Sequence, residues 1–355
     1  MRTRRSQSSS DPVLSSNLPA QAGHRLSSLM ESKHIPVLLH EIVEALSLVP
    51  SDVVVDATLG GAGHAAHIAK KLGKNGVLIG FDLDSEAIAR GKHALAGVRP
   101  KVHLVQANFR DLEEELDILG IRNITKALFD LGMSSYQLDS RLNSGLPAEA
   151  SAQAGRGFSF LRNEPLLMTY SVEPGPNALT AEKIVNEWDE ENIADVLWGW
   201  GEERYSRRIA RAIAEARVHA PIKTSQQLAD IVAAAVPPVY RKGPPFAKGY
   251  GGRRRIHPAT RTFQALRIAV NDELTTLTRG LTSAWNRLAP QGRIAVITFH
   301  SIEDRLVKQA FREWEKSGVG IRISKKPIRP TPEEVKQNPR ARSAKLRVIE
   351  KLNHK

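Results

Sequence analysis

The sequence predicts an α/β protein in which a parallel, doubly wound sheet is interrupted by a helical insertion. Two observations support this prediction. Short β-branched runs alternate with helical patterns from about residue 35 to residue 132, and such alternation is typical of a parallel sheet covered by helices. Helical patterns then follow one another without a strand between them. A β-branched run returns only at 292–300, so we expect the insertion to separate the fourth strand from the fifth.

The elements are expected in the following order. Four strands are predicted in the runs VVVDAT (53–58), VLIGFDLD (77–84), VHLVQANF (102–109) and KALFDLG (126–132), with helices over 64–72 and 85–95. A loop over 139–176 precedes helical segments over 181–200, 202–218 and 224–236, and a Pro/Gly/Arg loop covers 237–257. A helical segment over 259–288, the fifth strand, a helix over 302–316 and strand candidates over 321–324 and 346–352 complete the chain.

This order predicts two domains and a tail. We expect a flexible N-terminal tail over 1–33, because this segment is rich in Ser and Arg and has no apolar period. The main domain is expected to be discontinuous, formed by 34–138 and 255–355. Residues 139–254 are expected to form an inserted, mainly helical domain that recognises the substrate.

The composition excludes several classes of protein. Of the 355 residues, 41% are hydrophobic and 25% are charged, which is enough for a core and excludes disorder as the main state. No stretch approaches the roughly 20 apolar residues of a membrane span. The absence of cysteine excludes disulfide scaffolds, thiolate zinc sites and cysteine nucleophiles. We therefore expect a cytoplasmic protein, with an organelle matrix as the alternative if residues 1–33 are a transit peptide.

The basic surplus lies in the last third of the chain. The net charge is +13, and residues 251–355 hold 23 lysines and arginines against 9 acids. A clustered surplus is typical of proteins that bind a phosphate-rich partner, although a solvated basic surface is the alternative. The expected phosphate contacts are Arg253, Arg254, Arg255, Lys325, Lys326, Arg340, Arg342, Lys345 and Arg347.

A glycine-rich turn is the most informative motif. The first predicted strand ends at Asp56, three glycines follow, and a helix begins near His64. Glycines at a strand-to-helix turn let the backbone approach a ligand closely, and the helix N-terminus adds a favourable dipole. Asp82 ends the next strand, 21 positions after Gly61, where a carboxylate can accept hydrogen bonds from both hydroxyls of a ribose. This context predicts a cofactor that contains adenosine.

Two cofactors fit this turn. The stretch from Gly61 to Ala66 matches the dinucleotide fingerprint G-x-G-x-x-A, so a NAD-dependent oxidoreductase is one interpretation. Asp56 favours S-adenosylmethionine instead, because its carboxylate could pair with the amino group of a methionine but would repel a pyrophosphate. Asp130 ends the fourth strand, at the sheet edge where ligands of such folds bind. Each of these acids could also be a turn or helix cap.

Long segments elsewhere resemble one known family. They are HIPVLLHE (34–41), DATLGGAGH (56–64), DLGMSSYQLD (130–139), RGFSF (156–160), GEERYSRRIARAI (201–213), HPATRTFQALRIAVNDEL (257–274), ITFHSIEDR (297–305) and NPRARSAKLR (338–347). Together they resemble the RsmH (MraW) family of S-adenosylmethionine-dependent methyltransferases, which act on N4 of a cytidine in the decoding region of small-subunit (16S) ribosomal RNA. The resemblance extends over 34–352 and implies a Rossmann-like class I methyltransferase fold.

The resemblance also implies the site residues. The cofactor would be held by Ala62, Gly63, His64, Asp82, Phe109, Asp130 and Gln137, together with the Asp56 predicted above. Phe109 fits as a flat wall near the adenine, and a core aromatic is an equal alternative. The partner would be small-subunit ribosomal RNA or the assembled small subunit, with no membrane and a possible homodimer. We expect no metal site, because the histidines are scattered.

The expected chemistry follows from the target amine. The lone pair of this amine is delocalised into the ring, so catalysis should depend on alignment with the methyl group and on an acceptor for a proton. We expect Asp130 to be this acceptor and His300, beside Ser301, to contact the substrate or orient the loop. The absence of cysteine excludes the C6 adduct that C5-methylating enzymes form.

Some features leave alternatives open. Residues 140–155 interrupt the family pattern, and EPLLMTYS (164–171) lacks two acids and an arginine of it. These departures put substrate positioning in doubt, so a catalytically impaired, S-adenosylmethionine-binding ribosome assembly factor is a further interpretation. The arginines at 207, 208 and 211 could contact RNA or form an ordinary solvated helix face. Three tryptophans, Trp188, Trp198 and Trp200, are expected in the core.

Overall fold

The computed structural model describes residues 36–132, 155–160, 163–170, 175–238 and 257–353. These residues belong to one compact unit, Ile35–Lys355. None of the helices in these ranges is long and apolar enough to cross a membrane.

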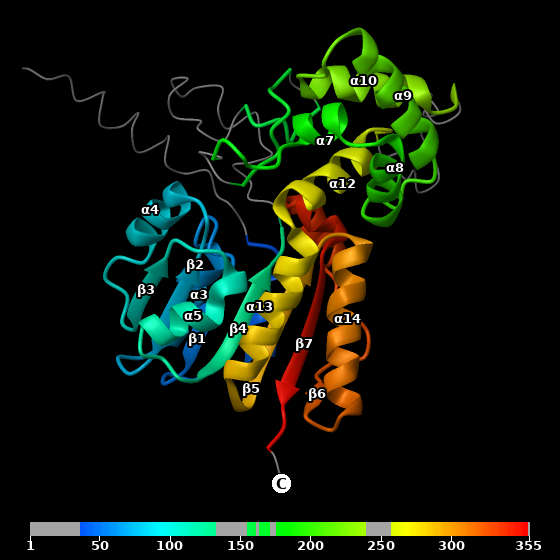
Figure 1. Cartoon of the computed structure of the whole chain (residues 1–355). Coiled ribbons are helices and arrows are strands. Elements are labelled where there is room, and N and C mark those ends of the chain that lie inside the picture. Colours follow the sequence, from blue (N-terminus) through cyan, green and yellow to red (C-terminus); the bar gives the residue numbers. More distant parts are fainter. Residues whose placement is uncertain (1–35, 133–154, 161–162, 171–174, 239–256, 354–355) are drawn as a thin grey trace, which may run out of the picture. The chain divides into compact units, whose positions relative to one another are not determined.

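In the described part of the chain, seven strands form one sheet in the order β3-β2-β1-β4-β5-β7-β6 (Figure 1). The strands are β1 (Val53–Asp56), β2 (Val77–Phe81), β3 (Lys101–Val105), β4 (Ile124–Asp130), β5 (Leu288–Thr298), β6 (Gly320–Arg322) and β7 (Lys345–Lys351). β1 to β5 pair in parallel, whereas β7 runs antiparallel to both β5 and β6. The strand order reverses between β1 and β4, where sheets of this kind open a ligand crevice. This topology confirms the predicted α/β, Rossmann-like sheet.

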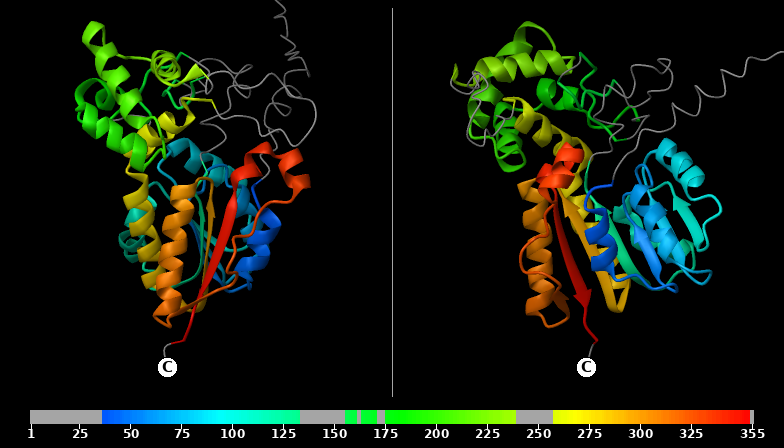
Figure 2. Two further views of the ribbon diagram at one scale, coloured as in Figure 1. Left: turned by 90° about the vertical axis from the view of Figure 1, so that its right-hand side faces the viewer. Right: turned by 180° about the vertical axis from the view of Figure 1, so that it is seen from behind.

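Helices cover both faces of the sheet (Figures 1 and 2). On one face, a cluster of buried side chains joins the sheet to α2 (Leu39–Leu46), α3 (Gly63–Lys71) and α4 (Ser85–Ala94). On the other face, a second cluster joins it to α5 (Leu112–Ile118), α13 (Glu273–Arg287) and α14 (Ser301–Lys316). Leu128 and Phe129 of β4 belong to opposite clusters, which explains why this strand reads as a continuous apolar run.

A third apolar cluster belongs to the helical part of the chain. It unites α7 (Ala181–Glu187), α8 (Glu190–Gly199), α9 (Ser206–His219), α10 (Ser225–Ala235) and α12 (Thr260–Asn271). The cap predicted at Thr224 or Ser225 is found at Thr224, whose side chain accepts from Gln227 N in a capping box. The domain boundaries at 138/139 and 254/255 stay predictions, and α12 shares its core with the four helices that precede it.

Several element boundaries differ from those expected. The segment 181–200 contains two helices, because the backbone is extended at Trp188 and Asp189. The segment 259–288 is also two helices, α12 and α13, because Asp272 between them has a left-handed φ of 47°. β3 ends at Val105, and Phe109 instead begins a short 3₁₀ helix, η1 (Phe109–Asp111). Much of the predicted loop over 139–176, and most of the predicted loop over 237–257, lie outside the described residues.

Two elements near the C-terminus were not predicted. They are α15 (Pro332–Gln337) and the 3₁₀ helix η3 (Pro339–Ser343). The sequence contained a signal for α15, because Thr331 caps it by accepting from Glu334 N and Pro332 stands in the first turn.

The expected core position is wrong for one tryptophan. Trp188 and Trp200 pack against the helical cluster, whereas Trp198 is 64% exposed. On α8 the buried positions are Ile193, Ala194, Val196 and Leu197, so Trp198 falls on the outward side of the helix.

Gly280 allows α13 to pack against Phe109. A Cβ at this position would lie 2.4 Å from Phe109 Cδ2 and 3.1 Å from the Phe109 carbonyl oxygen. We expect Gly280→Val to lower the free energy of unfolding by about 1–3 kcal/mol, as overpacked core sites do. Gly199→Ala is the matched control, because a Cβ there meets nothing within 4 Å. Chemical denaturation measures both variants, and an unchanged midpoint for Gly280→Val would contradict the packing described.

Candidate active site

Three carboxylates meet at one edge of the sheet. Asp56 ends β1, Asp82 directly follows β2 and Asp130 ends β4. These strands are neighbours and run parallel, so their carboxyl ends lie side by side. Asp56 is buried, whereas the Asp130 side chain is 22% exposed. The structure thus brings together the three acids that the sequence singled out.

Asp82 fixes the glycine turn to the end of β2. Its Oδ2 accepts from Gly60 N at 2.8 Å, and its Oδ1 accepts from Asp84 N at 2.9 Å. Burial raises the pKa of Asp82. Each carboxylate oxygen can still accept a further hydrogen bond, so this group remains able to bind hydroxyls of a ligand.

Asp56 is the most buried of the three carboxylates. Burial raises its pKa to about 6, with nearby Asp130 and Asp82 adding to the rise and His64 opposing it. The Thr58 backbone N donates to Asp56 Oδ1 at 3.2 Å, and the Thr58 hydroxyl accepts from Asp130 N at 2.7 Å. Thr58 therefore links the ends of β1 and β4, and a cation beside Asp56 would stabilise the ionised carboxylate.

The start of α3 faces these acids. Ala62 has a left-handed φ of 59°, and a Cβ on Gly63 would lie 2.6 Å from Pro36 Cγ. Glycine at 63 therefore serves the packing of Pro36 against the first turn. The His64 side chain is 8% exposed, and its Nε2 lies 3.4 Å from Asp130 Oδ2. The positive end of the helix dipole and this imidazole both favour negative charge at the strand ends.

Phe109 is held as a fixed, partly buried ring. It packs edge-to-face on Phe129, with ring centroids 5.5 Å apart, and Gly280 of α13 lies against it. Its role as a wall for adenine stays a prediction. Gln137, the remaining predicted cofactor ligand, lies outside the described residues.

His300 and Ser301 are engaged in structural contacts. His300 caps α14 through Nδ1, and its Nε2 lies 2.9 Å from Glu303 Oε1. The Ser301 hydroxyl donates to Glu202 Oε2 at 2.5 Å, and Arg305 donates to Glu202 Oε1 at 2.5 Å. These hydrogen bonds lower the pKa of Glu202. Both residues follow β5, at the sheet edge where the three acids lie. Their catalytic roles stay predictions.

A polar network beside His300 was missed in the sequence. Arg267 donates to both oxygens of Glu273, at 2.7 and 2.9 Å, and Tyr170 donates to Glu273 Oε1 at 2.8 Å. Burial raises the pKa of Tyr170. Glu273, His300 and Glu303 are the three residues with metal-ligand atoms within 4.8 Å of one another in the described ranges. Arg267 already supplies a positive charge there, and the predicted absence of a metal stays a prediction.

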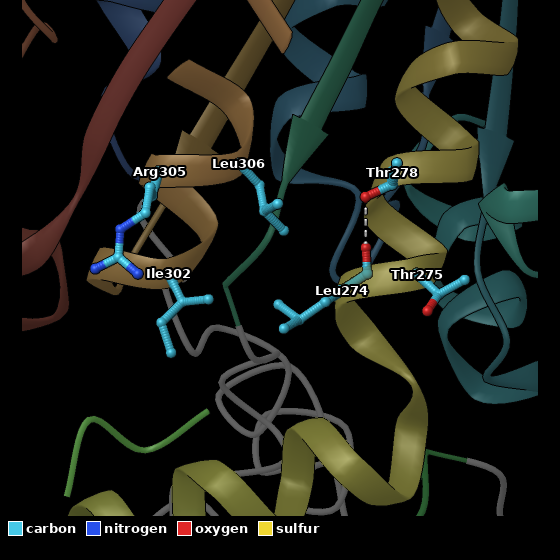
Figure 3. A pocket seen from close by; sticks show the side chains of 6 residues that line it. All are labelled: Leu274, Thr275, Thr278, Ile302, Arg305 and Leu306. Carbon is cyan, nitrogen blue, oxygen red and sulfur yellow. Dashed lines mark hydrogen bonds between the residues drawn. The ribbon is translucent and has the colours of Figure 1, made fainter. Parts of the chain in front are cut away.

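A shallow hollow of about 340 Å³ opens between α13 and α14 (Figure 3). It is lined by Leu274, Thr275, Thr278, Ile302, Arg305 and Leu306. Leu274 and Leu306 point toward each other across it (Figure 3). The hollow begins at the first turns of both helices, so it lies near the same sheet edge as the acids.

Part of the predicted basic surface can be placed. η3 directly precedes β7, whose first residue pairs with Thr298 at the end of β5, so Arg340 and Arg342 lie near the sheet edge of the acids. Arg342 is exposed and Arg340 is half-buried. Their RNA contacts stay predictions. Arg253, Arg254 and Arg255 lie outside the described residues.

Arg347 does not belong to that surface. It is 6% exposed and its Nε donates to Asp304 at 2.7 Å, so its predicted phosphate contact is wrong. Lys345 donates to the other oxygen of Asp304 at 2.9 Å. β7 pairs with β5, and this pairing brings both cations to α14.

Sequence comparisons with known proteins agree on one family. The chain is 41% identical over 334 residues to the ribosomal RNA small subunit methyltransferase H of Brevibacillus brevis, covering 90% of this chain and 98% of the relative. It is 42% identical over 338 residues to the protein of the same name from Symbiobacterium thermophilum, covering 91% and 98%. Among solved structures, a putative methyltransferase from Streptococcus mutans in complex with SAH is more distant, with 12% identity, 90% and 99% coverage and a TM-score of 0.39. The family model of the MraW methylase family matches residues 31–352, and the chain belongs to this family.

Proposed function

We propose that this methylase transfers a methyl group from S-adenosylmethionine to the exocyclic N4 of a cytidine in the decoding region of small-subunit ribosomal RNA. The observation that supports it most is the meeting of Asp56, Asp82 and Asp130 around His64 at the glycine turn. The names of the curated relatives support the small-subunit RNA as substrate. The choice of N4 and of the decoding region rests on the resemblance of the sequence motifs.

The acids at the sheet edge fit the cofactor of this family, which is S-adenosylmethionine. This molecule has an ammonium group and a sulfonium group, and both suit a site with three carboxylates. The same carboxylates would repel the pyrophosphate of a dinucleotide, so the NAD-dependent alternative is disfavoured by charge. We propose that Asp56 pairs with the ammonium group, Asp82 accepts from the ribose hydroxyls and Phe109 covers the adenine.

When bound, the cofactor supplies an electrophilic methyl group. The target amine must give up one proton as its nitrogen is methylated, and a carboxylate within reach can accept it. Asp130 suits this role, because its side chain is partly exposed and it lies at the end of β4 beside the proposed cofactor site. Gly132 follows it, and a Cβ there would lie 2.8 Å from the Phe299 ring. Glycine at this position thus allows the chain after β4 to lie close to Phe299 at the end of β5.

The RNA is proposed to lie along the basic segments near this edge. Arg340 and Arg342, with the arginines at 253–255, would bind phosphates and give an affinity that falls with salt. The target base must leave its stack to reach the methyl group, which favours a single-stranded or partly structured region. A cytoplasmic location and a homodimer stay predictions.

Two residues in the described part of EPLLMTYS (164–171) can be placed by their contacts. Tyr170 bonds to Glu273, and Glu164 accepts from Gly157 N at 3.0 Å. Neither of these two contacts involves Asp56, Asp82 or Asp130. We therefore propose an active enzyme and treat an assembly factor without catalysis as an outcome of the test.

Mass spectrometry of small-subunit RNA tests the proposal. RNA from cells with and without the gene is digested to nucleosides and to mapped fragments. We expect one N4-methylated cytidine in the decoding region to lose its N4-methyl group in the deletion strain and to regain it on complementation. Identical RNA in both strains, with the subunit assembling slowly in the deletion strain, would favour the assembly factor instead.

The raised pKa of Asp56 predicts that cofactor binding depends on pH. Its pKa of about 6 in the protein alone means that the carboxyl group becomes protonated as the pH falls below this value. The ammonium group pairs only with the ionised form, so affinity for S-adenosylmethionine should fall by up to about tenfold per pH unit below pH 6. Isothermal titration calorimetry from pH 5 to pH 8 measures it. In Asp56→Asn the affinity should be lower and this slope should be absent, and the same slope in both proteins would refute the assignment.

Asp130→Asn tests the proton acceptor. The amide keeps the size of the side chain and cannot accept a proton, so we expect methyl transfer to fall by at least about 100-fold. Thermal unfolding should change little, since the side chain is partly exposed. Asp195→Asn, on the exposed side of α8, is the matched control. Transfer at near-normal rate in Asp130→Asn would show that another group accepts the proton.

A further inference from the structure

His64 is a buried imidazole without a hydrogen bond. Neither Nδ1 nor Nε2 makes one within the described residues, although the side chain is only 8% exposed. Most buried polar atoms are hydrogen-bonded, so an exception at a ligand site calls for an explanation. The Nε2 atom faces Asp130 Oδ2 at 3.4 Å, slightly beyond the usual hydrogen-bond range. Such contacts are often long in a site without its ligands and tighten when the ligands bind.

The position of this imidazole is fixed by the packing of α3. Ala62 and Ala65, on either side of the first turn, are buried in the cluster that holds this helix against the sheet. Pro36 occupies the space where Gly63 has no side chain. Because the backbone on both sides is held, His64 stays directed at the end of β4.

Two further hydrogen bonds hold Asp130 in place. Its N donates to the Thr58 hydroxyl at 2.7 Å, and its Oδ1 accepts from Gly132 N at 3.3 Å. Oδ2 is the oxygen that faces His64. An N–H on Nε2 would therefore complete the support of this carboxylate and fix the directions of its remaining lone pairs.

We propose that His64 is a positioning residue that acts through Asp130, by donating from Nε2–H to Asp130 Oδ2 during methyl transfer. The inference rests on the proposed function, because it needs Asp130 to accept the proton of the amine. His64 keeps its own proton in this step. The new bond joins the amine nitrogen to the methyl carbon. The bond between this carbon and the sulfonium sulfur breaks, its electron pair stays on sulfur, and the proton released by the amine moves to Asp130.

Other charged groups near the imidazole are compatible with this role. Asp56, at the end of β1, also interacts electrostatically with His64. A neutral imidazole with its proton on Nε2 turns its positive edge toward Asp130, whereas the Nδ1–H tautomer would present a lone pair to the carboxylate and repel it. The carboxylate of Asp130 therefore selects the Nε2–H tautomer.

Single-turnover kinetics at saturating S-adenosylmethionine test the proposal. Cofactor affinity is measured separately, because His64 also stands in the predicted cofactor loop. We expect His64→Leu to lower the transfer rate by about 100-fold, and His64→Gln, which keeps an N–H donor, to recover about tenfold of this loss. His93→Gln is the matched control, since His93 is an exposed histidine on α4. Its rate should match that of the wild type.

The double variant shows whether His64 acts through Asp130. In the Asp130→Asn background, His64→Leu should cause no further loss, because the group that it positions is already removed. Two results would overturn the proposal. One is a wild-type rate for both His64 variants once the cofactor saturates, which would leave only a cofactor contact. The other is a loss that adds fully to that of Asp130→Asn.

Nuclear magnetic resonance gives a readout that needs no activity. In protein with ¹⁵N-labelled histidine and bound S-adenosylhomocysteine, we expect His64 to be the Nε2–H tautomer, with signals that shift in Asp130→Asn and stay in place in Asp195→Asn. The Nδ1–H tautomer, or no shift in Asp130→Asn, would refute the inference. If the wild-type enzyme leaves cytidine N4 unmodified while these signals behave as expected, the proposed function alone fails.

Discussion

The burial of carboxylates at three neighbouring strand ends is the constraint on which the rest of the site depends. Parallel strands β2, β1 and β4 end side by side, and each ends at or just before an aspartate. The fold offsets part of the negative charge with the backbone N–H groups of Gly60 and Asp84 on Asp82 and with the first turn of α3. Burial raises the pKa of Asp56, the most buried of the three, and the neighbouring Asp130 and Asp82 add to this rise. The remaining imbalance favours a ligand that brings positive charge, as S-adenosylmethionine does.

Polar contacts near the end of β5 connect the sheet to the helices from α7 to α12. Glu202, between α8 and α9, has a left-handed φ of 49° and binds both Ser301 and Arg305 at the start of α14. Such a conformation is costly for a residue other than glycine and persists where several contacts hold it. Tyr170, Arg267 and Glu273 form a second connection beside His300. The helical part, which the sequence predicts to recognise the substrate, is thus joined to the sheet edge by two groups of polar contacts.

Much of the fold followed from local patterns. β-branched runs alternating with helical periods predicted the parallel sheet, and the meeting of the acids followed because the carboxyl ends of parallel strands share an edge. Contacts that depend on distant pairing could not be predicted. Arg347 looked like a phosphate ligand until the antiparallel pairing of β7 with β5 placed it on Asp304. The bond from Tyr170 to Glu273 spans 103 positions, and no local pattern indicates it.

A crystal structure of the protein with S-adenosylhomocysteine would show directly whether the three acids form the cofactor site. We expect the amino group of the ligand to lie beside Asp56, its ribose hydroxyls to donate to Asp82, and its sulfur to be directed toward the side of Asp130. A ligand bound elsewhere on the protein, or bound at the glycine turn without contact to Asp56 and Asp82, would contradict this expectation.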